Sequence, residues 1–156
     1  MGLTAIGASV IAAQQTEIRF WLITWLVEAL LAFVIGLFAM WQKSKFAGTP
    51  LASQPARKFA LCFAPPIVAG VILTGLFYKN NWFTELPSVW LTLYGTAVIT
   101  GGIYSVRIVP VAGWCFVALG LVSVVLPASY GNLMMGLGFG VLHVVFGLIV
   151  ARRYGG

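Results

Sequence analysis

Long apolar runs separated by short polar stretches dominate the sequence. A helix that crosses the hydrocarbon layer of a membrane, about 30 Å thick, needs roughly 20 mostly apolar residues. Within that layer every backbone polar group must be paired inside a helix or a closed barrel, and runs of this length favour the helix. Five runs meet the requirement: 18–41, 59–78, 88–106, 111–126 and 133–151. The sequence therefore predicts an all-α integral membrane protein, a single domain over residues 1–156 with five transmembrane helices.

Polar stretches predict the connections between these helices. The longest covers residues 42–58, where a glycine and two prolines disfavour a helix. The last two apolar runs are short and rich in glycine, so an alternative interpretation has four spanning helices and a re-entrant hairpin. Residues 1–17 are too short to cross, and we expect an interfacial helix at the membrane surface or a helix packed on the bundle.

Basic residues are distributed unequally between the two ends of the predicted bundle. With five spans, one end receives Lys43, Lys45, Arg57, Lys58, Arg107, Arg152 and Arg153. The other end receives only Arg19 and Lys79. Because short loops rich in Lys and Arg remain in the cytoplasm, the sequence predicts an outer N-terminus and a cytoplasmic C-terminus. We expect a multi-pass protein of the bacterial inner membrane.

Composition supports the membrane assignment and explains the net charge. Hydrophobic residues make up 61% of the chain and charged residues only 8%, against about a quarter charged in soluble domains. The formal net charge of +6 is explained by residues that set topology and face lipid headgroups. Membrane lipids are therefore expected partners, and no nucleic-acid partner is needed.

Two ionisable residues, Glu28 and His143, lie deep in the predicted spans. Such residues are costly in hydrocarbon and usually face the bundle interior. Their spans run in the same direction, and each residue lies near the middle of its span, so their heights differ by roughly 5 Å. A direct or water-mediated hydrogen bond could join them and carry a proton. In the alternative, each bonds a Thr, a Tyr or a backbone carbonyl and fixes helix register.

Three glycines and His143 share one predicted face of the fifth span. Gly136, Gly140, His143 and Gly147 follow a spacing of four, three and four residues, which keeps them on one side of an α-helix. Small residues let helices approach closely in membranes, so this face predicts an interface with the chain itself, a second copy or another subunit. In a further alternative, His143 is an axial ligand to haem or to chlorophyll.

A polar stripe follows the third span. Its members recur every four residues: Ser88, Thr92, Thr96, Thr100 and Tyr104. Threonine hydroxyls commonly donate to the carbonyl of the preceding helical turn, which would satisfy the stripe within its own helix. Otherwise it lines a polar crevice or bonds Glu28, and then these residues belong with Glu28 and His143 to a buried proton or ion site.

Two adjacent prolines, Pro65 and Pro66, lie within the second span. They remove two backbone donors and leave the carbonyls of Leu61 and Cys62 without their helical partners. The sequence therefore predicts a kink or a new helix start at this point.

The residues of catalysis are scarce. The chain has no aspartate. One of its three glutamates is predicted to be buried, and the other two lie near the predicted outer end. This distribution argues against paired-carboxylate catalysis. No Cys/His cluster has the spacing of a metal site. We therefore expect a non-enzymatic protein that acts through helix packing, as an accessory subunit of a larger membrane complex or as a homo-oligomer. The alternatives are a small transporter or proton pathway and a haem- or chlorophyll-binding subunit.

Overall fold

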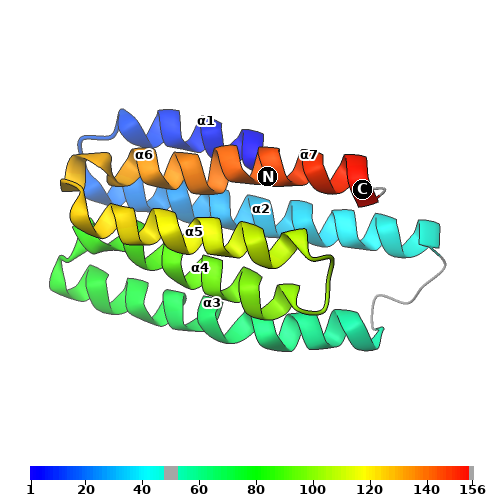
Figure 1. The fold of residues 1–156 in the computed structure, drawn as a ribbon. Helices are drawn as coiled ribbons and strands as arrows, with labels where there is room; N and C mark the ends of the chain where they lie inside the picture. Colours follow the sequence, from blue (N-terminus) through cyan, green and yellow to red (C-terminus); the bar gives the residue numbers. More distant parts are fainter. Residues whose placement is uncertain (48–52, 155–156) are drawn as a thin grey trace.

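A computed structural model of the protein describes residues 1–47 and 53–154, and within these residues the chain is helical with no strand. The main helices are α1 (Gly2–Ala13), α2 (Ile18–Ala47), α3 (Gln54–Asn80), α4 (Leu86–Gly102) and α5 (Ile108–Val125). A final rod consists of α6 (Gly131–Met135), the π-helical segment η3 (Gly136–Leu142) and α7 (His143–Tyr154). Short 3-10 turns, η1 (Phe83–Glu85) and η2 (Ala128–Tyr130), precede α4 and α6. The long helices lie side by side in one bundle (Figure 1).

Four helical stretches are long and apolar enough to cross a membrane: Ile18–Gln42, Gln54–Asn80, Ile108–Val125 and Ala128–Tyr154. The third predicted span is not among these four. It corresponds to α4, which has only 17 residues and includes four Ser or Thr side chains. An all-helical membrane bundle with four candidate spanning helices is thus what the structure shows.

The connection between the first two long helices is shorter than the predicted range 42–58, because helix covers both ends of that range. Helix α2 continues to Ala47, and α3 begins at Gln54; residues 48–52 lie outside the described residues. Lys and Gln are good helix formers, so α2 continues beyond its apolar part. Pro55 lies in the first turn of α3, where its missing N–H costs nothing. The polar residues mark the end of the apolar span, but the helix continues through them.

The proline pair does not start a new helix. Helix α3 runs without interruption from Gln54 to Asn80 with both prolines inside it, so a break at Pro65 and Pro66 was the wrong expectation. The Thr100 hydroxyl of α4 donates to the carbonyl of Cys62 at 2.9 Å. That carbonyl is the acceptor left by Pro66, so a neighbouring helix replaces the missing donor.

Helix α1 packs on the bundle. It runs antiparallel to α2 and lies beside both α2 and the final rod (Figure 1). With 12 residues against the 30 of α2, it covers only the half of α2 nearest their connection. The apolar N-terminal segment therefore lies along the bundle axis, as the second of the two sequence interpretations expected.

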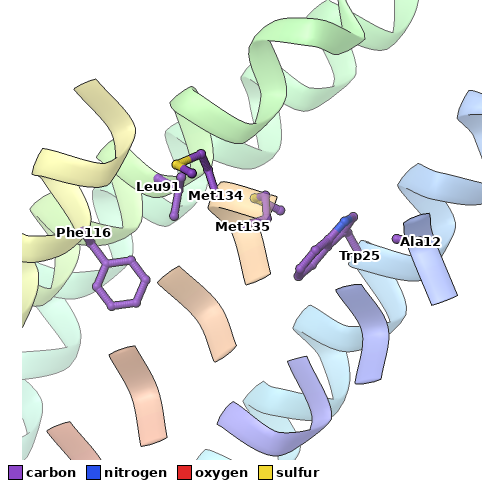
Figure 2. Packing of buried hydrophobic residues seen from close by; sticks show 6 residues of the cluster. All are labelled: Ala12, Trp25, Leu91, Phe116, Met134 and Met135. Atoms are coloured by element: carbon purple, nitrogen blue, oxygen red, sulfur yellow. The ribbon is translucent and has the colours of Figure 1, made fainter. Parts of the chain in front are cut away.

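The apolar core lies where the final rod meets its neighbours. Its buried members come from five elements: Ala12, Trp25, Leu91, Phe116, Met134 and Met135. Figure 2 shows Trp25 pointing from α2 toward the rod, with Leu91 and Phe116 on the other side. The adjacent residues Met134 and Met135 are both buried, which requires neighbours on two sides of α6. The core thus joins the rod to α1, α2, α4 and α5.

Candidate functional site

The two ionisable residues of the bundle interior each have a different hydrogen-bond partner. The Oε1 atom of Glu28 lies 2.8 Å from the Thr4 hydroxyl of α1. The Nε2 atom of His143 lies 2.8 Å from the Tyr94 hydroxyl of α4. The structure therefore does not join Glu28 directly to His143. The partners are a Thr and a Tyr hydroxyl, in keeping with the alternative drawn from the sequence.

Glu28 and His143 nevertheless lie at a similar level in the bundle. The rings of Trp25 and Phe139 are 6.4 Å apart between α2 and the rod. Glu28 follows Trp25 by three residues and His143 follows Phe139 by four, on helices that run in the same direction (Figure 1). Each is therefore about one turn beyond the Trp25–Phe139 contact.

Four polar side chains from four different elements thus form a polar layer inside an apolar bundle. We call this set the mid-bundle polar layer: Thr4, Glu28, Tyr94 and His143.

Aromatic rings enclose His143. The ring centroids of Tyr94, Phe116 and Phe139 lie 5.4, 5.3 and 6.2 Å from the imidazole centroid. Nε2 bonds Tyr94, and Nδ1 is buried without a hydrogen-bond partner among the described residues. Neither nitrogen faces open space. The residues present therefore do not fit axial ligation of haem or chlorophyll, which needs one free nitrogen beside room for a flat macrocycle.

Two of the predicted interface glycines meet α1 of the same chain. A Cβ added to Gly136 would lie 2.6 Å from Ser9 Oγ, and one added to Gly140 would lie 2.7 Å from Ile6 Cγ1. The absence of a side chain at these two positions permits so close an approach. Part of the predicted glycine face is therefore an intramolecular interface, and its partner is the N-terminal helix.

The other two members of that face point elsewhere. His143 turns toward Tyr94, and a Cβ on Gly147 would meet nothing within 4 Å. The cause lies in the π-helical segment Gly136–Leu142. A π turn holds more residues than an α turn, so residues after it are rotated relative to those before it. The regular α-helical spacing assumed for the sequence does not apply across η3.

The threonine stripe is satisfied largely within α4. Thr96 donates to the carbonyl of Thr92 at 2.8 Å, and Thr100 lies 2.9 Å from the carbonyl of Thr96. Ser88 likewise donates to the Glu85 carbonyl at 2.9 Å.

The stripe does not extend to the rest of the predicted buried site. Tyr104 lies beyond the end of α4 and is 44% exposed. Within the described ranges, the hydrogen bonds of the stripe reach Cys62 of α3 but not Glu28.

Asn132 is the polar residue that sequence reasoning missed. Its Oδ1 accepts hydrogen bonds from the indole N–H groups of Trp21 and Trp25, at 3.2 and 3.1 Å. Its Nδ2 donates to the Ser9 carbonyl at 2.9 Å. One amide thus joins α1, α2 and α6. The available signal was the i, i+4 tryptophan pair, because each buried indole needs an acceptor.

Two hollows flank Asn132 where α1 joins α2. One, of about 140 Å³, includes Trp21, Phe83 and Thr84 in its lining, and the other, of about 470 Å³, includes Ser9 and Leu133. Ser129 and Asn132 line both hollows. No charged side chain is among the lining residues, and the Asn132 amide is already occupied by Trp21, Trp25 and Ser9.

Comparison of the chain with protein families, with curated proteins and with solved structures finds no match. The function must therefore be argued from the residues and their arrangement.

Proposed function

We propose that the protein is a five-span protein of the bacterial inner membrane with its C-terminus in the cytoplasm. In this proposal α4 is the fifth span, because it lies between α3 and α5 and packs extensively on both. The short helix is lengthened by η1, so that helical turns run from Phe83 to Gly102. That length suits a span of roughly 20 residues.

The arrangement of the chain supports the orientation. Helix α2 ends, α3 begins, α4 joins α5 and α7 ends on the same side of the bundle (Figure 1). All seven basic residues assigned to the cytoplasm belong to these segments, whereas Glu17 and Glu85 belong to the opposite end. A short-loop excess of Lys and Arg on one side favours the cytoplasm for that side.

A C-terminal reporter tests the orientation. A green fluorescent protein fused after Gly156 should fluoresce, and an alkaline phosphatase at the same place should be inactive, because the former needs the cytoplasm and the latter the periplasm. The reverse pattern would show that the orientation is inverted. Fusions after Asn81, between α3 and η1, provide the matched control and should give the opposite result.

The protein acts, in this proposal, without catalysis, as an accessory subunit or a homo-oligomer held by helix packing. The observation that carries it concerns α2. Among the described elements, α1 is the one against which α2 packs extensively, and Trp21 and Trp25 bridge α2 to Asn132 of α6. Beyond the reach of α1, four large apolar side chains of α2 face outward: Leu37, Phe38, Met40 and Trp41.

The close glycine contacts of the chain, in contrast, are used within the bundle. Gly136 and Gly140 are covered by α1, so the face first expected to meet a partner is largely occupied. Helix association in lipid depends on side-chain packing rather than on exclusion of water. The part of α2 beyond α1 therefore offers a partner helix an apolar surface on which no other described element packs extensively.

Cysteine cross-linking tests this assignment. In a background with Cys62 and Cys115 replaced by serine, Leu37→Cys and Phe38→Cys should cross-link in native membranes to one stoichiometric partner or to a second copy. Val71→Cys and Ile72→Cys on α3, which also face outward, are the matched controls. Native mass spectrometry of the wild-type protein should show the same partner. Equal cross-linking from α2 and α3, with a monomer in the mass spectrum, would overturn the proposal.

A further inference from the structure

Three basic side chains gather where α3 begins and α4 joins α5. Arg57 and Lys58 belong to the first two turns of α3, and Arg107 is the residue directly before α5. All three are exposed. The segments that carry them lie at the same end of the bundle (Figure 1). Together with Tyr104 of the α4–α5 connection, we call this set the basic corner.

Two glycine contacts hold the basic corner together. A Cβ built on Gly101 would lie 3.1 Å from Phe59 Cε2, and a Cβ on Gly102 would lie 2.8 Å from Val109 Cγ1. Gly101 and Gly102 are the last two residues of α4, so α3 and α5 both touch the end of this helix. Phe59 and Val109 each lie within two positions of a basic residue. The cations of α3 and α5 are therefore brought together across the end of α4.

The three acidic residues of the chain all lie away from the basic corner. Glu17 and Glu85 belong to the opposite end of the bundle, and Glu28 bonds Thr4 in the mid-bundle polar layer. The first turns of α3 and α5 contain no acidic residue. The positive charge of the basic corner thus has no acidic side chain beside it.

The terminal charges do not change this balance. The N-terminal ammonium is positive and belongs to the start of α1, which packs on α2 and the rod. The carboxylate that ends the sequence follows Arg152 and Arg153 of α7. Helix α7 is not among the elements that pack extensively on α3. An anion from outside the chain is therefore the natural counter-charge for the basic corner.

Exposed apolar side chains adjoin these cations. Leu61, about one helical turn after Lys58, is 63% exposed, and Ile103, next to Tyr104, is 69% exposed. The Nζ atom of Lys58 lies 5.8 Å from the centroid of the Tyr104 ring, within the range of a cation–π contact. Aromatic rings with a polar end prefer the interface between membrane and water. Cations and exposed apolar side chains in one place match the two parts of a phospholipid.

We infer that the basic corner binds one anionic phospholipid, whose phosphate contacts the three cations and whose acyl chain lies along Leu61 and Ile103. Arg side chains suit the phosphate because the guanidinium presents several N–H donors to its oxygens, and basic pockets between membrane helices are typical headgroup sites. A soluble acidic protein would match the charge but not the apolar side chains. The site rests on the proposed insertion of α3, α4 and α5 in the membrane. It does not depend on the orientation or on the partner at α2.

Lipid titration followed by native mass spectrometry tests the site. Purified wild-type protein in detergent micelles should bind one phosphatidylglycerol at least about tenfold more tightly than phosphatidylcholine. The triple variant Arg57→Gln, Lys58→Gln and Arg107→Gln should lose at least about tenfold of that affinity. The matched control, Lys45→Gln, Arg152→Gln and Arg153→Gln, removes the same charge from the same end of the bundle and should lose less than about threefold.

Two results would overturn the inference. Equal losses in the two triple variants would show a general attraction of headgroups to basic residues, and equal affinity of the wild type for both lipids would show no preference for the anion. If the first triple variant does not fold by circular dichroism, Arg107→Gln and Arg152→Gln repeat the comparison, and only the former should weaken binding. Either failure would leave the cross-linking test of α2 unaffected.

Competition separates a lipid from other anions. Soluble glycerol phosphate offers the same phosphate without acyl chains, and polyglutamate offers the charge of an acidic protein. Neither should displace phosphatidylglycerol from the wild-type protein at equal concentration. Displacement by glycerol phosphate would show a site for free phosphate, and displacement by polyglutamate would show a site for an acidic chain. Each of these outcomes would contradict the lipid.

Discussion

The backbones of α4 and α5 touch at Gly95 and Gly113. A Cβ built on Gly95 would lie 2.7 Å from the carbonyl oxygen of Gly113, and a Cβ on Gly113 would lie 2.7 Å from the carbonyl oxygen of Gly95. The relationship is reciprocal, and neither backbone oxygen can move aside without moving its helix. Close approach at small residues is the usual means of packing helices in lipid, and here it operates within one chain.

Replacement of Gly113 by alanine should therefore destabilise the bundle. The added methyl group must separate α4 from α5, and overpacking of this kind costs about 1–3 kcal/mol. Unfolding of the purified protein in mixed micelles with increasing denaturing detergent measures the change. Gly147→Ala is the matched control, because a Cβ there meets nothing within 4 Å, and it should be neutral or slightly stabilising. Equal losses in both variants would contradict the close contact.

Thr100→Val should destabilise the protein because it removes a hydrogen bond between α4 and α3. The variant leaves the Cys62 carbonyl without the donor that replaces the missing N–H of Pro66, at a cost of about 0.5–2 kcal/mol. Thr96→Val is the control, because the Thr96 hydroxyl bonds a carbonyl of its own helix, and it should cost less.

A second variant checks that the proline is the cause. Pro66→Ala restores a backbone N–H for the Cys62 carbonyl, so Thr100→Val should cost less in that background than in wild type. The free energy of unfolding of the four proteins gives the coupling directly. Additive effects would show that the hydrogen bond to Cys62 does not depend on Pro66.

Asn132→Leu should separate α1 and α2 from the rod. Two indole N–H groups lose their common acceptor, and each unsatisfied buried donor costs about 1–3 kcal/mol. We expect lower stability and a changed tryptophan emission spectrum, because the polar contacts of Trp21 and Trp25 are lost. Asn80→Leu, at an exposed site whose side chain donates to the carbonyl of Leu76 in its own helix, should leave both properties close to wild type.

The Tyr94–His143 hydrogen bond predicts energetic coupling. In a double-mutant cycle of Tyr94→Phe and His143→Ala, residues in contact should show an interaction energy of about 0.5–3 kcal/mol. A parallel cycle of Glu28→Gln and His143→Ala should show a smaller one, because these residues bond different partners. A larger coupling for Glu28 than for Tyr94 would favour the direct pair first considered from the sequence.

Apolar run length predicted the helices well because lipid imposes one simple requirement on each span. The sequence ranges 18–41 and 59–78 both lie inside observed helices, α2 and α3. The ends were predicted less well, since a helix that has left the hydrocarbon layer needs no apolar residues to continue. Pro55 was read as a sign of a loop, although a proline in the first turn is also typical of a helix start.

The sequence could predict only those features of the site that do not depend on how the helices pack against one another. Glu28 and His143 were identified because their cost in lipid is independent of the fold, but their partners depend on how α1 and α4 pack. The face of Gly136 and Gly147 was predicted from α-helical pitch, which the π segment between them does not keep. Asn132 was overlooked because its role depends on two tryptophans more than one hundred residues away.

The contacts of α1 also set an order of assembly. Among the described helices it is the first to be synthesised, yet Gly2, Ile6 and Ser9 pack on residues of the rod, which are the last to be made. Since a chain emerges from the ribosome N-terminus first, α1 must wait for every later helix before it reaches its place. Of the described helices, the one made first is therefore the last one to complete its packing.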